Sequence, residues 1–382
     1  MNNNSFFEKA SFNQKIIFFS MGLLMAVFSI YLTSHYFTAK YPTGFESGSM
    51  CNINSFFNCD ATTLSPLGNI AGIPISIFGI LIGGFLMLSY LFKSDENEGT
   101  LYTVLGVNIV GCILLFLYSL LVLKHLCPFC TLYYIVSFIA FFMLHKISEQ
   151  RKPAVKHMAI YAVVTVLVAG SSWGMIQSWE KKNEAMAGKI VEMFNGLQNL
   201  GAPTKSSPYR LASSSENFTD APIQLSVFSD FQCPACNAMD MVLPKIEEKY
   251  KGKINIQYFF YPLDHNCNAA MDRPLHPLAC EAAYMASCAG PERFKKVHDD
   301  IFASQSELSM TWIQDYATKL GVTECMKKPE TKQLVVDMIN QADTFNVKST
   351  PTQLLNGVKI EGVRQLKEYY AIMDDILKKA GK

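Results

Sequence analysis

The sequence predicts a multidomain protein in which an all-helical, membrane-spanning region precedes a soluble α/β domain. Half of the 382 residues are hydrophobic and only 17% are charged, a balance typical of membrane proteins. The apolar runs are confined to the first half of the chain, and strand-like and helix-like patterns alternate after residue 221. Eleven cysteines, most of them in spaced pairs, indicate at least one oxidising compartment. The formal net charge of +1 gives no reason to expect nucleic acid as a partner.

Five apolar runs are long enough to cross a bilayer, which takes about 20 helical residues. They cover residues 16–37, 73–92, 101–123, 127–144 and 158–179. The first run has no convincing small-residue cleavage site, so we interpret it as a retained span rather than a signal peptide. Pro74 opens the second run, where its missing N–H costs little because the first turn of a helix has no partner for it.

Basic residues predict the orientation of these spans, because cytoplasmic segments carry an excess of Lys and Arg. The opposite short segments hold only Lys40 and Lys124. The N-terminus is therefore expected in the cytoplasm, and five spans place the C-terminal domain and all the cysteine pairs on the other side. The basic residues of the segments assigned to the cytoplasm are Lys9, Lys15, Lys93, Lys146, Arg151, Lys152 and Lys156.

The C-terminal part has the element order of a thioredoxin with a helical insertion. A polar stretch with helical spacing and a Pro-, Ser- and Ala-rich segment form a linker over residues 180–221. Asn356-Gly357 is a strong hairpin signal between the last two strands. Strands are expected at 223–228, 254–260, 352–355 and 358–361, and helices at 239–250, within 275–342 and at 366–377.

Two C-x-x-C pairs carry the chemistry that the sequence indicates most clearly. Cys233 and Cys236 precede a predicted helix, whose dipole lowers the pKa of a thiol at its N-terminus. We expect Cys233 to be the attacking thiol and Cys236 the resolving one. Cys127 and Cys130 open the fourth apolar run, where thiols in contact with water can meet an oxidant dissolved in lipid.

Cys51 and Cys59 form a third pair, in the loop after the first span. Thiol–disulfide exchange requires contact between sulfur atoms, so a pair that visits both C-x-x-C sites needs a mobile loop. The loop at 38–69 contains small residues that favour mobility, namely Gly44, Ser47, Gly48, Ser49 and Ser55.

The cysteines could also have roles other than redox exchange. A C-x-x-C pair can hold a metal or form a static disulfide, and Cys51 with Cys59 can simply brace the loop. We expect no metal site, because the histidines lack ligand spacing with the cysteines. Cys112, unpaired within a span, is interpreted as a small apolar core residue.

Four motifs lie in the C-terminal part, namely the segment from Phe228 to Cys236, His276-Pro277, Ala282-Ala283 and Thr350-Pro351. Together they resemble the DsbA-type thioredoxin-fold oxidoreductases. In that family the first cysteine, here Cys233, exchanges with client proteins. The residue before a cis-proline, here Thr350 before Pro351, contacts the client backbone. The Pro-Ala dipeptide between the cysteines departs from the best-known oxidants and leaves the redox potential open.

One set of residues in the first half of the chain consists of Cys51, Cys59, Ser65, Gly72-Ile-Pro74, Gly79 and Cys127-Pro-Phe-Cys130. This set resembles the vitamin K epoxide reductase family in its bacterial form with a fused thioredoxin-like domain. The resemblance implies a four-helix bundle around a quinone (ubiquinone or menaquinone), with the fifth span as a tether. Cys127 and Cys130 would be the active pair, with Cys130 nearest the quinone, and Cys51 and Cys59 the shuttle. Within the shuttle, Cys51 would accept electrons from Cys233 and Cys59 would pass them to Cys127. Ser65 and Tyr134 would line the quinone site; for Tyr134 a packing or lipid-facing role is the alternative.

Four further cysteines lie in the insertion and allow three pairings. The DsbA-type resemblance favours structural disulfides Cys267–Cys280 and Cys288–Cys325. A second redox pair is the alternative.

These interpretations combine into one hypothesis. We expect a quinone-reducing transmembrane domain at 1–157, a tethering helix at 158–179, a linker at 180–221 and a DsbA-like domain at 222–382. Reduced exported clients would pass electrons to Cys233/Cys236, then Cys51/Cys59, Cys127/Cys130 and quinone, at a bacterial inner membrane with the C-terminal domain on its periplasmic or extracytoplasmic side. The alternatives are a reductase or isomerase that runs the relay in reverse, and a non-catalytic membrane protein that binds metal through its cysteines.

Overall fold

The computed structural model describes residues 11–45, 51–54, 56–89, 95–149 and 151–381. Predictions that rest on Lys9 and Lys93 for orientation, or on Ser47, Gly48, Ser49 and Ser55 for loop mobility, therefore lie outside the described residues. The chain divides into two compact units, Met1–Pro42 with Glu46–Glu184 and Thr43–Phe45 with Ala185–Lys382.

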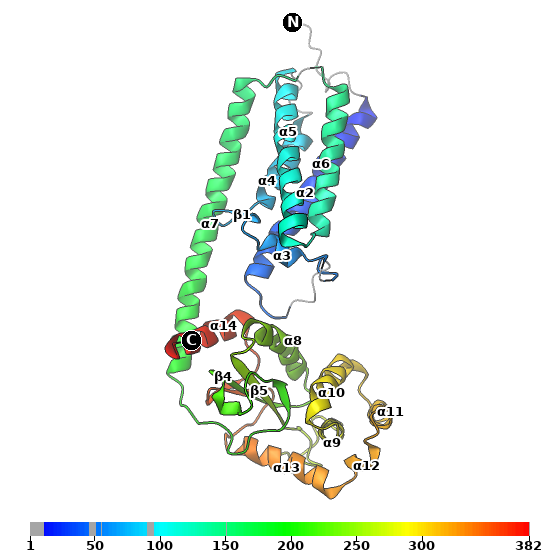
Figure 1. Ribbon diagram of the computed structural model, residues 1–382, viewed down its shortest axis with the longest axis vertical. Coiled ribbons are helices and arrows are strands. Elements are labelled where there is room, and N and C mark those ends of the chain that lie inside the picture. The colour runs from blue at the N-terminus through cyan, green and yellow to red at the C-terminus, as the bar shows by residue number, and fades with distance from the viewer. Residues whose placement is uncertain (1–10, 46–50, 55, 90–94, 150, 382) are drawn as a thin grey trace. The chain divides into compact units, whose positions relative to one another are not determined.

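The first unit is a bundle of apolar helices (Figure 1). Within the described part of the chain, four helical segments are long and apolar enough to cross a membrane, namely Phe12–Lys40, Asn97–Leu123, Pro128–Ile147 and Val155–Asn195. They belong to α2 (Phe12–Lys40), α5 (Asp95–Tyr118) with the π-helical turn η2 (Ser119–Leu123), α6 (Pro128–Ile147) and α7 (Val155–Asn195). A capping box starts α2, since Ser11 and Gln14 exchange hydrogen bonds between side chain and backbone.

The second predicted span is a shorter helix than the sequence suggests. Ile73 and Pro74 form the strand β2 (Ile73–Pro74), which pairs with β1 (Asn69–Ile70). The apolar helix α4 (Ser76–Leu88) begins only after this hairpin and has 13 residues. The run from 73 to 92 loses its first turn to strand pairing, and residues 90–94 lie outside the described part of the chain.

Glycines allow α2 and α4 to cross at close range. A Cβ atom added at Gly83 would lie 2.6 Å from the carbonyl oxygen of Gly22, and one at Gly22 would lie 2.7 Å from the carbonyl oxygen of Gly83. Both distances are too short for non-bonded atoms. Small residues at a membrane helix interface permit this approach, so the two glycines determine how closely α2 and α4 pack.

The helix α7 extends beyond the predicted span at 158–179, because the polar residues that follow continue the helix to Asn195. Near its start, the Tyr161 hydroxyl donates to Asn97 Oδ1 at 2.8 Å. Further along, Lys40 Nζ lies 2.6 Å from Glu180 Oε1. These contacts hold α7 to the other helices of the first unit.

The second unit is a five-stranded sheet with helices packed around it. The strand order is β3-β5-β4-β6-β7, with β4 and β5 parallel and the other neighbours antiparallel. Asn356 and Gly357 both have positive φ, 46° and 84°, in the turn that joins β6 to β7. The short strand β3 lies inside the predicted linker. The strands are β3 (Arg210–Ala212), β4 (Ile223–Ser229), β5 (Ile254–Phe260), β6 (Thr352–Leu355) and β7 (Val358–Glu361).

Helices of the second unit follow the predicted order. α8 (Pro234–Lys249) follows β4, and α14 (Leu366–Lys379) ends the chain. The insertion between β5 and β6 contains α9 (Ala279–Cys288), α10 (Pro291–Ala303), α11 (Met310–Leu320), α12 (Thr323–Met326) and α13 (Pro329–Asp343). Disulfides join Cys267 to Cys280 and Cys288 to Cys325, which is the pairing that the resemblance favours.

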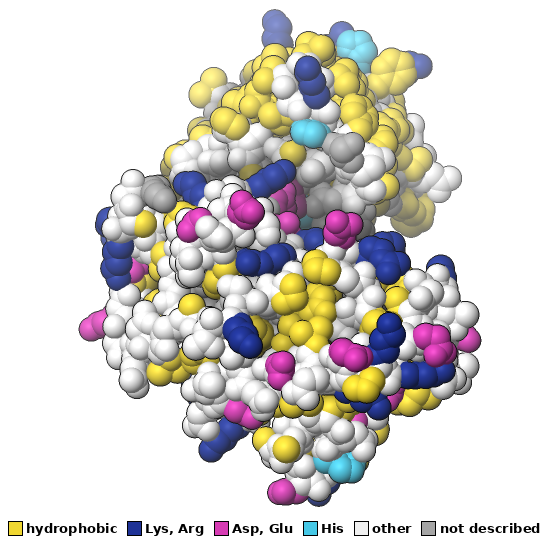
Figure 2. All heavy atoms as spheres, turned by 60° about the horizontal axis from the view of Figure 1, so that its bottom comes forward, with side chains coloured by type: hydrophobic (Ala, Val, Ile, Leu, Met, Phe, Trp, Pro, Cys, Tyr) yellow, Lys and Arg dark blue, Asp and Glu magenta, His cyan; other side chains and the backbone are white. Residues whose placement is uncertain are grey.

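The surfaces of the two units differ in composition. Hydrophobic side chains dominate the helical unit in Figure 2, whereas Lys, Arg, Asp and Glu are interspersed over the other unit. The apolar core of the second unit is fully enclosed, with Leu225, Ile246, Tyr258 and Phe294 each at 0% exposure. This contrast is expected for a lipid-facing bundle and a water-soluble domain.

Candidate redox centres

Cys51 and Cys59 are held at one end of the helical bundle. Cys59 begins the short helix α3 (Cys59–Thr63), where the Asn58 side chain accepts the Ala61 N–H at 3.0 Å. Asn52 Oδ1 accepts the N–H of Cys59 at 2.8 Å. Cys51 and Cys59 are joined by a disulfide, and both are fully buried.

Cys127 lies directly against this disulfide. It is the N-cap residue of α6, with Pro128 at the first helical position. The Cys127 sulfur lies 2.9 Å from the Cys59 sulfur and 3.9 Å from the Cys51 sulfur. Backbone hydrogen bonds from Asn58 N–H to Leu126 O, 3.0 Å, and from Leu126 N–H to Phe56 O, 2.8 Å, hold the two segments together. Sulfur atoms in contact are what thiol–disulfide exchange requires.

The same three sulfurs lie within 4.8 Å of one another, a spacing that a metal ion also accepts. Metal binding needs deprotonated thiolates, however, and two of these sulfurs form a disulfide. In this oxidation state the cluster is suited to exchange rather than to coordination.

Cys130 lines two cavities inside the bundle. The smaller, of about 50 Å3, is lined by Ser65, Cys130 and Tyr134 among others. The larger, of about 140 Å3, is lined by Cys130, Tyr134 and Asn108. Ser65 and Tyr134 are thus brought to the thiol with which the sequence associates them. Asn108 had no sequence signal, because a single polar residue within a span does not reveal which way it faces.

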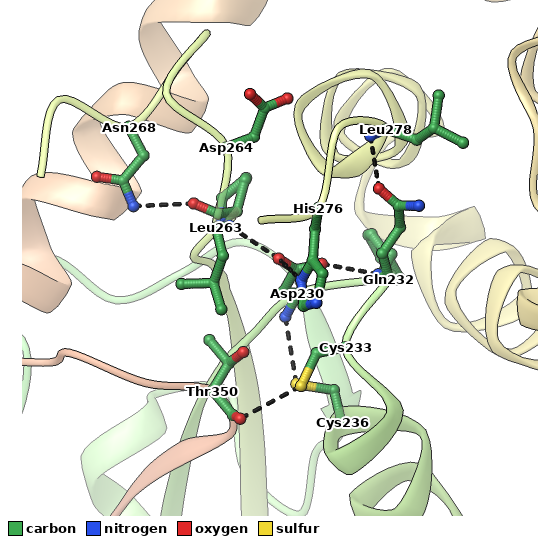
Figure 3. Close-up of polar contacts among 12 residues, drawn as sticks. Asp230, Gln232, Cys233, Cys236, Leu263, Asp264, Asn268, His276, Leu278 and Thr350 are labelled. Atoms are coloured by element: carbon green, nitrogen blue, oxygen red, sulfur yellow. Dashed lines mark hydrogen bonds and ion pairs between the residues drawn. The ribbon is translucent and has the colours of Figure 1, made fainter. Parts of the chain in front are cut away.

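The second redox centre starts α8 in the soluble unit. Cys233 is the N-cap residue and Pro234 the first helical residue. The Thr350–Pro351 peptide bond is cis, as the sequence predicts. The Cys233 thiol donates to the Thr350 carbonyl oxygen at 3.3 Å (Figure 3). The buried Thr350 hydroxyl has no hydrogen-bond partner among the described residues, so it is free to donate to a Cys233 thiolate.

The two thiols of this pair have opposite pKa shifts. A hydrogen bond from the Cys236 thiol is the largest influence that lowers the pKa of Cys233, to about 5, with further help from Thr350 and the backbone N–H groups of Ala235 and Cys236. Burial raises the pKa of Cys236 well above its usual value. Cys233 is therefore the thiolate at neutral pH, and Cys236 stays a thiol.

A buried carboxylate, Asp230, organises the loop in front of the pair (Figure 3). Its Oδ1 accepts the Gln232 N–H and its Oδ2 accepts the Leu263 N–H, both at 2.7 Å. His276 Nδ1 lies 2.8 Å from the same Oδ2, and this hydrogen bond raises the pKa of His276. The Cys233 charge also raises the His276 pKa, so a cationic imidazole and the thiolate stabilise each other.

Gln305 holds the other side of the loop. Its Nε2 donates to the carbonyl oxygens of Phe231 and Cys233 at 2.8 and 3.0 Å. Its Oε1 accepts from Asn237 Nδ2 at 3.1 Å. Sequence reasoning missed this residue, because Gln305 reaches the loop from an insertion about seventy residues away and belongs to no local motif.

Comparison with known proteins finds a match for each of the two units that contain these redox centres. Residues 16–145 match the family model described as the vitamin K epoxide reductase family, and residues 218–375 match the one described as thioredoxin. The chain therefore combines a region that matches the vitamin K epoxide reductase family with a region that matches thioredoxin. Together with the apolar helices and the cysteine pairs, this makes the protein a membrane disulfide oxidoreductase.

Several relatives resemble part of the chain. A probable disulfide bond formation protein D of Bacillus anthracis is 28% identical over 153 residues, which are 36% of this chain and 67% of the relative. Disulfide bond formation protein D of Bacillus subtilis is 23% identical over 173 residues, 42% of this chain and 74% of the relative. The structure of the catalytic domain of Proteus mirabilis ScsC covers 52% of this chain and 98% of its own, with 15% identity and a TM-score of 0.37.

Proposed function

We propose that the protein forms disulfides in exported proteins and passes the electrons to a quinone. The contact between the sulfurs of Cys59 and Cys127, 2.9 Å apart, carries this proposal. It joins a loop disulfide to a thiol pair whose second member, Cys130, lines two cavities inside an apolar bundle. A thiol protein that acted only in water would have no use for such a buried second pair.

The relay consists of successive thiol–disulfide exchanges. A reduced client converts the Cys233–Cys236 disulfide to two thiols and becomes a disulfide itself. The two thiols then reduce the Cys51–Cys59 disulfide, with Cys233 and Cys51 as the sulfurs that meet. Reduced Cys59 attacks Cys127 of a Cys127–Cys130 disulfide, and Cys51 closes back onto Cys59. Each exchange converts two thiols to one disulfide and one disulfide to two thiols, so electrons and protons balance.

The residues around Cys130 suit a quinone. The larger cavity, of about 140 Å3, is mostly apolar and is lined by Asn108, whose buried amide nitrogen Nδ2 has no hydrogen-bond partner among the described residues. Ser65 and Tyr134 line the smaller cavity, whose wall also includes Cys130. A quinone, ubiquinone or menaquinone, supplies the acceptor for two electrons and two protons when the Cys127–Cys130 disulfide forms.

The low pKa of Cys233 supports the oxidising direction. A thiolate stabilised by its surroundings favours the reduced form of the pair, which makes the disulfide form a stronger oxidant of clients. Thr350 beside cis-Pro351 would bind the client backbone. The two units share one chain, so a high effective concentration replaces a separate partner protein. We place the protein in a bacterial inner membrane, with its N-terminus in the cytoplasm and the thioredoxin domain outside it.

The test is quinone reduction by the purified full chain with a reduced, cysteine-containing peptide. Cys233→Ala should abolish turnover with the peptide but retain turnover with dithiothreitol, which can reduce Cys51–Cys59 directly. Cys127→Ala should abolish both. Wild-type rates of quinone reduction by Cys127→Ala would contradict the relay. A potential of the Cys233/Cys236 pair near thioredoxin's, about −270 mV rather than about −120 mV as in DsbA, would favour the reverse direction.

A further inference from the structure

The larger cavity beside Cys130 has the size of one aromatic ring. Its volume is about 140 Å3, and an engineered cavity of about 150 Å3 lined by Leu, Ile and Phe binds benzene. Residues from α2, α4, α5 and α6 form its wall, and most of these side chains are apolar, for example Leu32, Ile82 and Leu115. Among the described residues that line it, Asn108 contributes the only carboxamide group.

The amide of Asn108 has a defined orientation. The Tyr133 hydroxyl donates to Asn108 Oδ1 at 3.0 Å, and the Cys112 sulfur lies 3.9 Å from the same oxygen. The oxygen is thereby engaged, and the two N–H groups on Nδ2 are left. Nδ2 is buried and has no hydrogen-bond partner among the described residues.

A buried amide nitrogen without a partner is costly, so its retention at this place needs a reason. A quinone carbonyl offers an acceptor oxygen, which is the complement of an N–H donor. A ring seated in the same cavity also lies against Cys130, the thiol from which the electrons leave.

We infer that Asn108 Nδ2 binds a ring carbonyl oxygen of the quinone and seats the ring beside Cys130. This inference rests on the proposed function, since it assigns a role at the proposed quinone site. Tyr133 acts as a positioning residue, because its hydroxyl holds the amide oxygen and so turns the amide nitrogen away from it. The site would recognise compounds by a carbonyl acceptor on a flat ring.

Direct binding provides the main test. The probe is tetramethyl-1,4-benzoquinone, whose fully substituted ring has no free position for thiol addition, dialysed to equilibrium against the full chain in detergent. Asn108→Leu should raise the dissociation constant about tenfold, which is the loss of one hydrogen bond of about 1.4 kcal/mol. Hexamethylbenzene has a similar shape without a carbonyl, and it should compete equally well for the wild type and the variant.

Two further variants make the result specific. Val107→Leu, at a neighbouring position that is 68% exposed, should bind the probe as the wild type does. Tyr133→Phe removes only the hydroxyl that orients the amide and should weaken binding in the same direction by a smaller factor. Thermal unfolding of each detergent-solubilised variant, followed by the helical circular dichroism signal, verifies that the helical unit is folded.

The outcomes separate the inference from the proposed function. Unchanged probe binding in both Asn108→Leu and Tyr133→Phe, with normal quinone turnover, would overturn the role of Asn108 and leave the relay standing. Equal weakening of hexamethylbenzene would indicate a collapsed cavity rather than a lost donor, and would also overturn it. A wild-type protein that neither binds nor reduces any quinone would remove the proposed function and this inference with it.

Discussion

The thiol of Cys236 should control the charge of Cys233. Its hydrogen bond is the largest influence that lowers the pKa of Cys233 to about 5. A hydrogen bond to a charged group contributes about 1.5–3 kcal/mol, and one pKa unit corresponds to about 1.4 kcal/mol. Cys236→Ala should therefore raise the pKa of Cys233 by about one to two units. At pH 6 the thiolate fraction would fall from about 90% to between about 10% and 50%.

A matched variant separates the hydrogen bond from packing. Cys236→Ser retains a hydroxyl donor in place of the thiol, so we expect the pKa of Cys233 to stay within about one unit of the wild-type value. The assay is the pH dependence of iodoacetamide alkylation in the reduced full chain, followed by mass spectrometry of the peptide that contains Cys233. Because this readout is specific to one residue, the other cysteines do not interfere. Equal pKa values in the Ala and Ser variants would refute the reasoning.

Three further predictions concern the two units. Burial raises the pKa of Asp240 to about 6. The contribution of Asp240 to stability is therefore present below the ordinary pKa of about 3.9 and is lost as pH rises through the folded value. Asp240→Asn should stabilise the soluble unit by about 1–2 kcal/mol at pH 7.5 and by less at pH 4.5, measured by denaturant unfolding of the full chain. The hydrogen bond to Asp230 is the largest influence that raises the pKa of His276. The contribution of His276 to stability is therefore complete below about pH 6.5 and is lost as pH rises through the folded value. The melting temperature of the oxidised wild type should exceed that of His276→Gln by less at pH 9 than at pH 6, and a constant difference would contradict this. Gly83→Ala places a Cβ 2.6 Å from the Gly22 carbonyl oxygen, whereas the Cβ of Gly84→Ala meets nothing within 4 Å. Only Gly83→Ala should therefore destabilise the helical unit, by about 1–3 kcal/mol through overpacking. The measurement is thermal unfolding of the detergent-solubilised chain.

The elements that sequence predicts best are those with a strong local pattern. β5, β6 and β7 begin and end at the predicted residues, because apolar alternation and the Asn356-Gly357 turn are local signals. β3 was expected to be linker, because three residues carry no pattern of their own and become a strand only by pairing with β5. The second apolar run was expected to span the membrane, but strand pairing at Ile73 and Pro74 delays the start of α4.

The positions of the reactive cysteines on their elements were also predictable. Proline after the first cysteine and an apolar or amphipathic run behind it indicate a helix start, and the structure places both Cys127 and Cys233 at N-caps. By contrast, Gln305 and Asn108 gave no signal. Their roles depend on side chains that approach from elements distant in the sequence, and no periodicity reports such an approach.

The sequence by itself determined the order of spans and strands, the cysteine pairs and their placement at helix starts, because these follow from residue spacing and local backbone preference. Only the tertiary structure decided which sulfurs meet. The four cysteines of the insertion allow three pairings, and residue spacing alone does not choose among them. The fold joins Cys267 to Cys280 and Cys288 to Cys325. The fold likewise brings Cys59 rather than Cys51 nearest to Cys127. It also places Asn108 in the wall of a ring-sized cavity, with its amide nitrogen buried and without a hydrogen-bond partner among the described residues. Contact between atoms is what exchange and recognition require, and contact is a property of packing rather than of pattern.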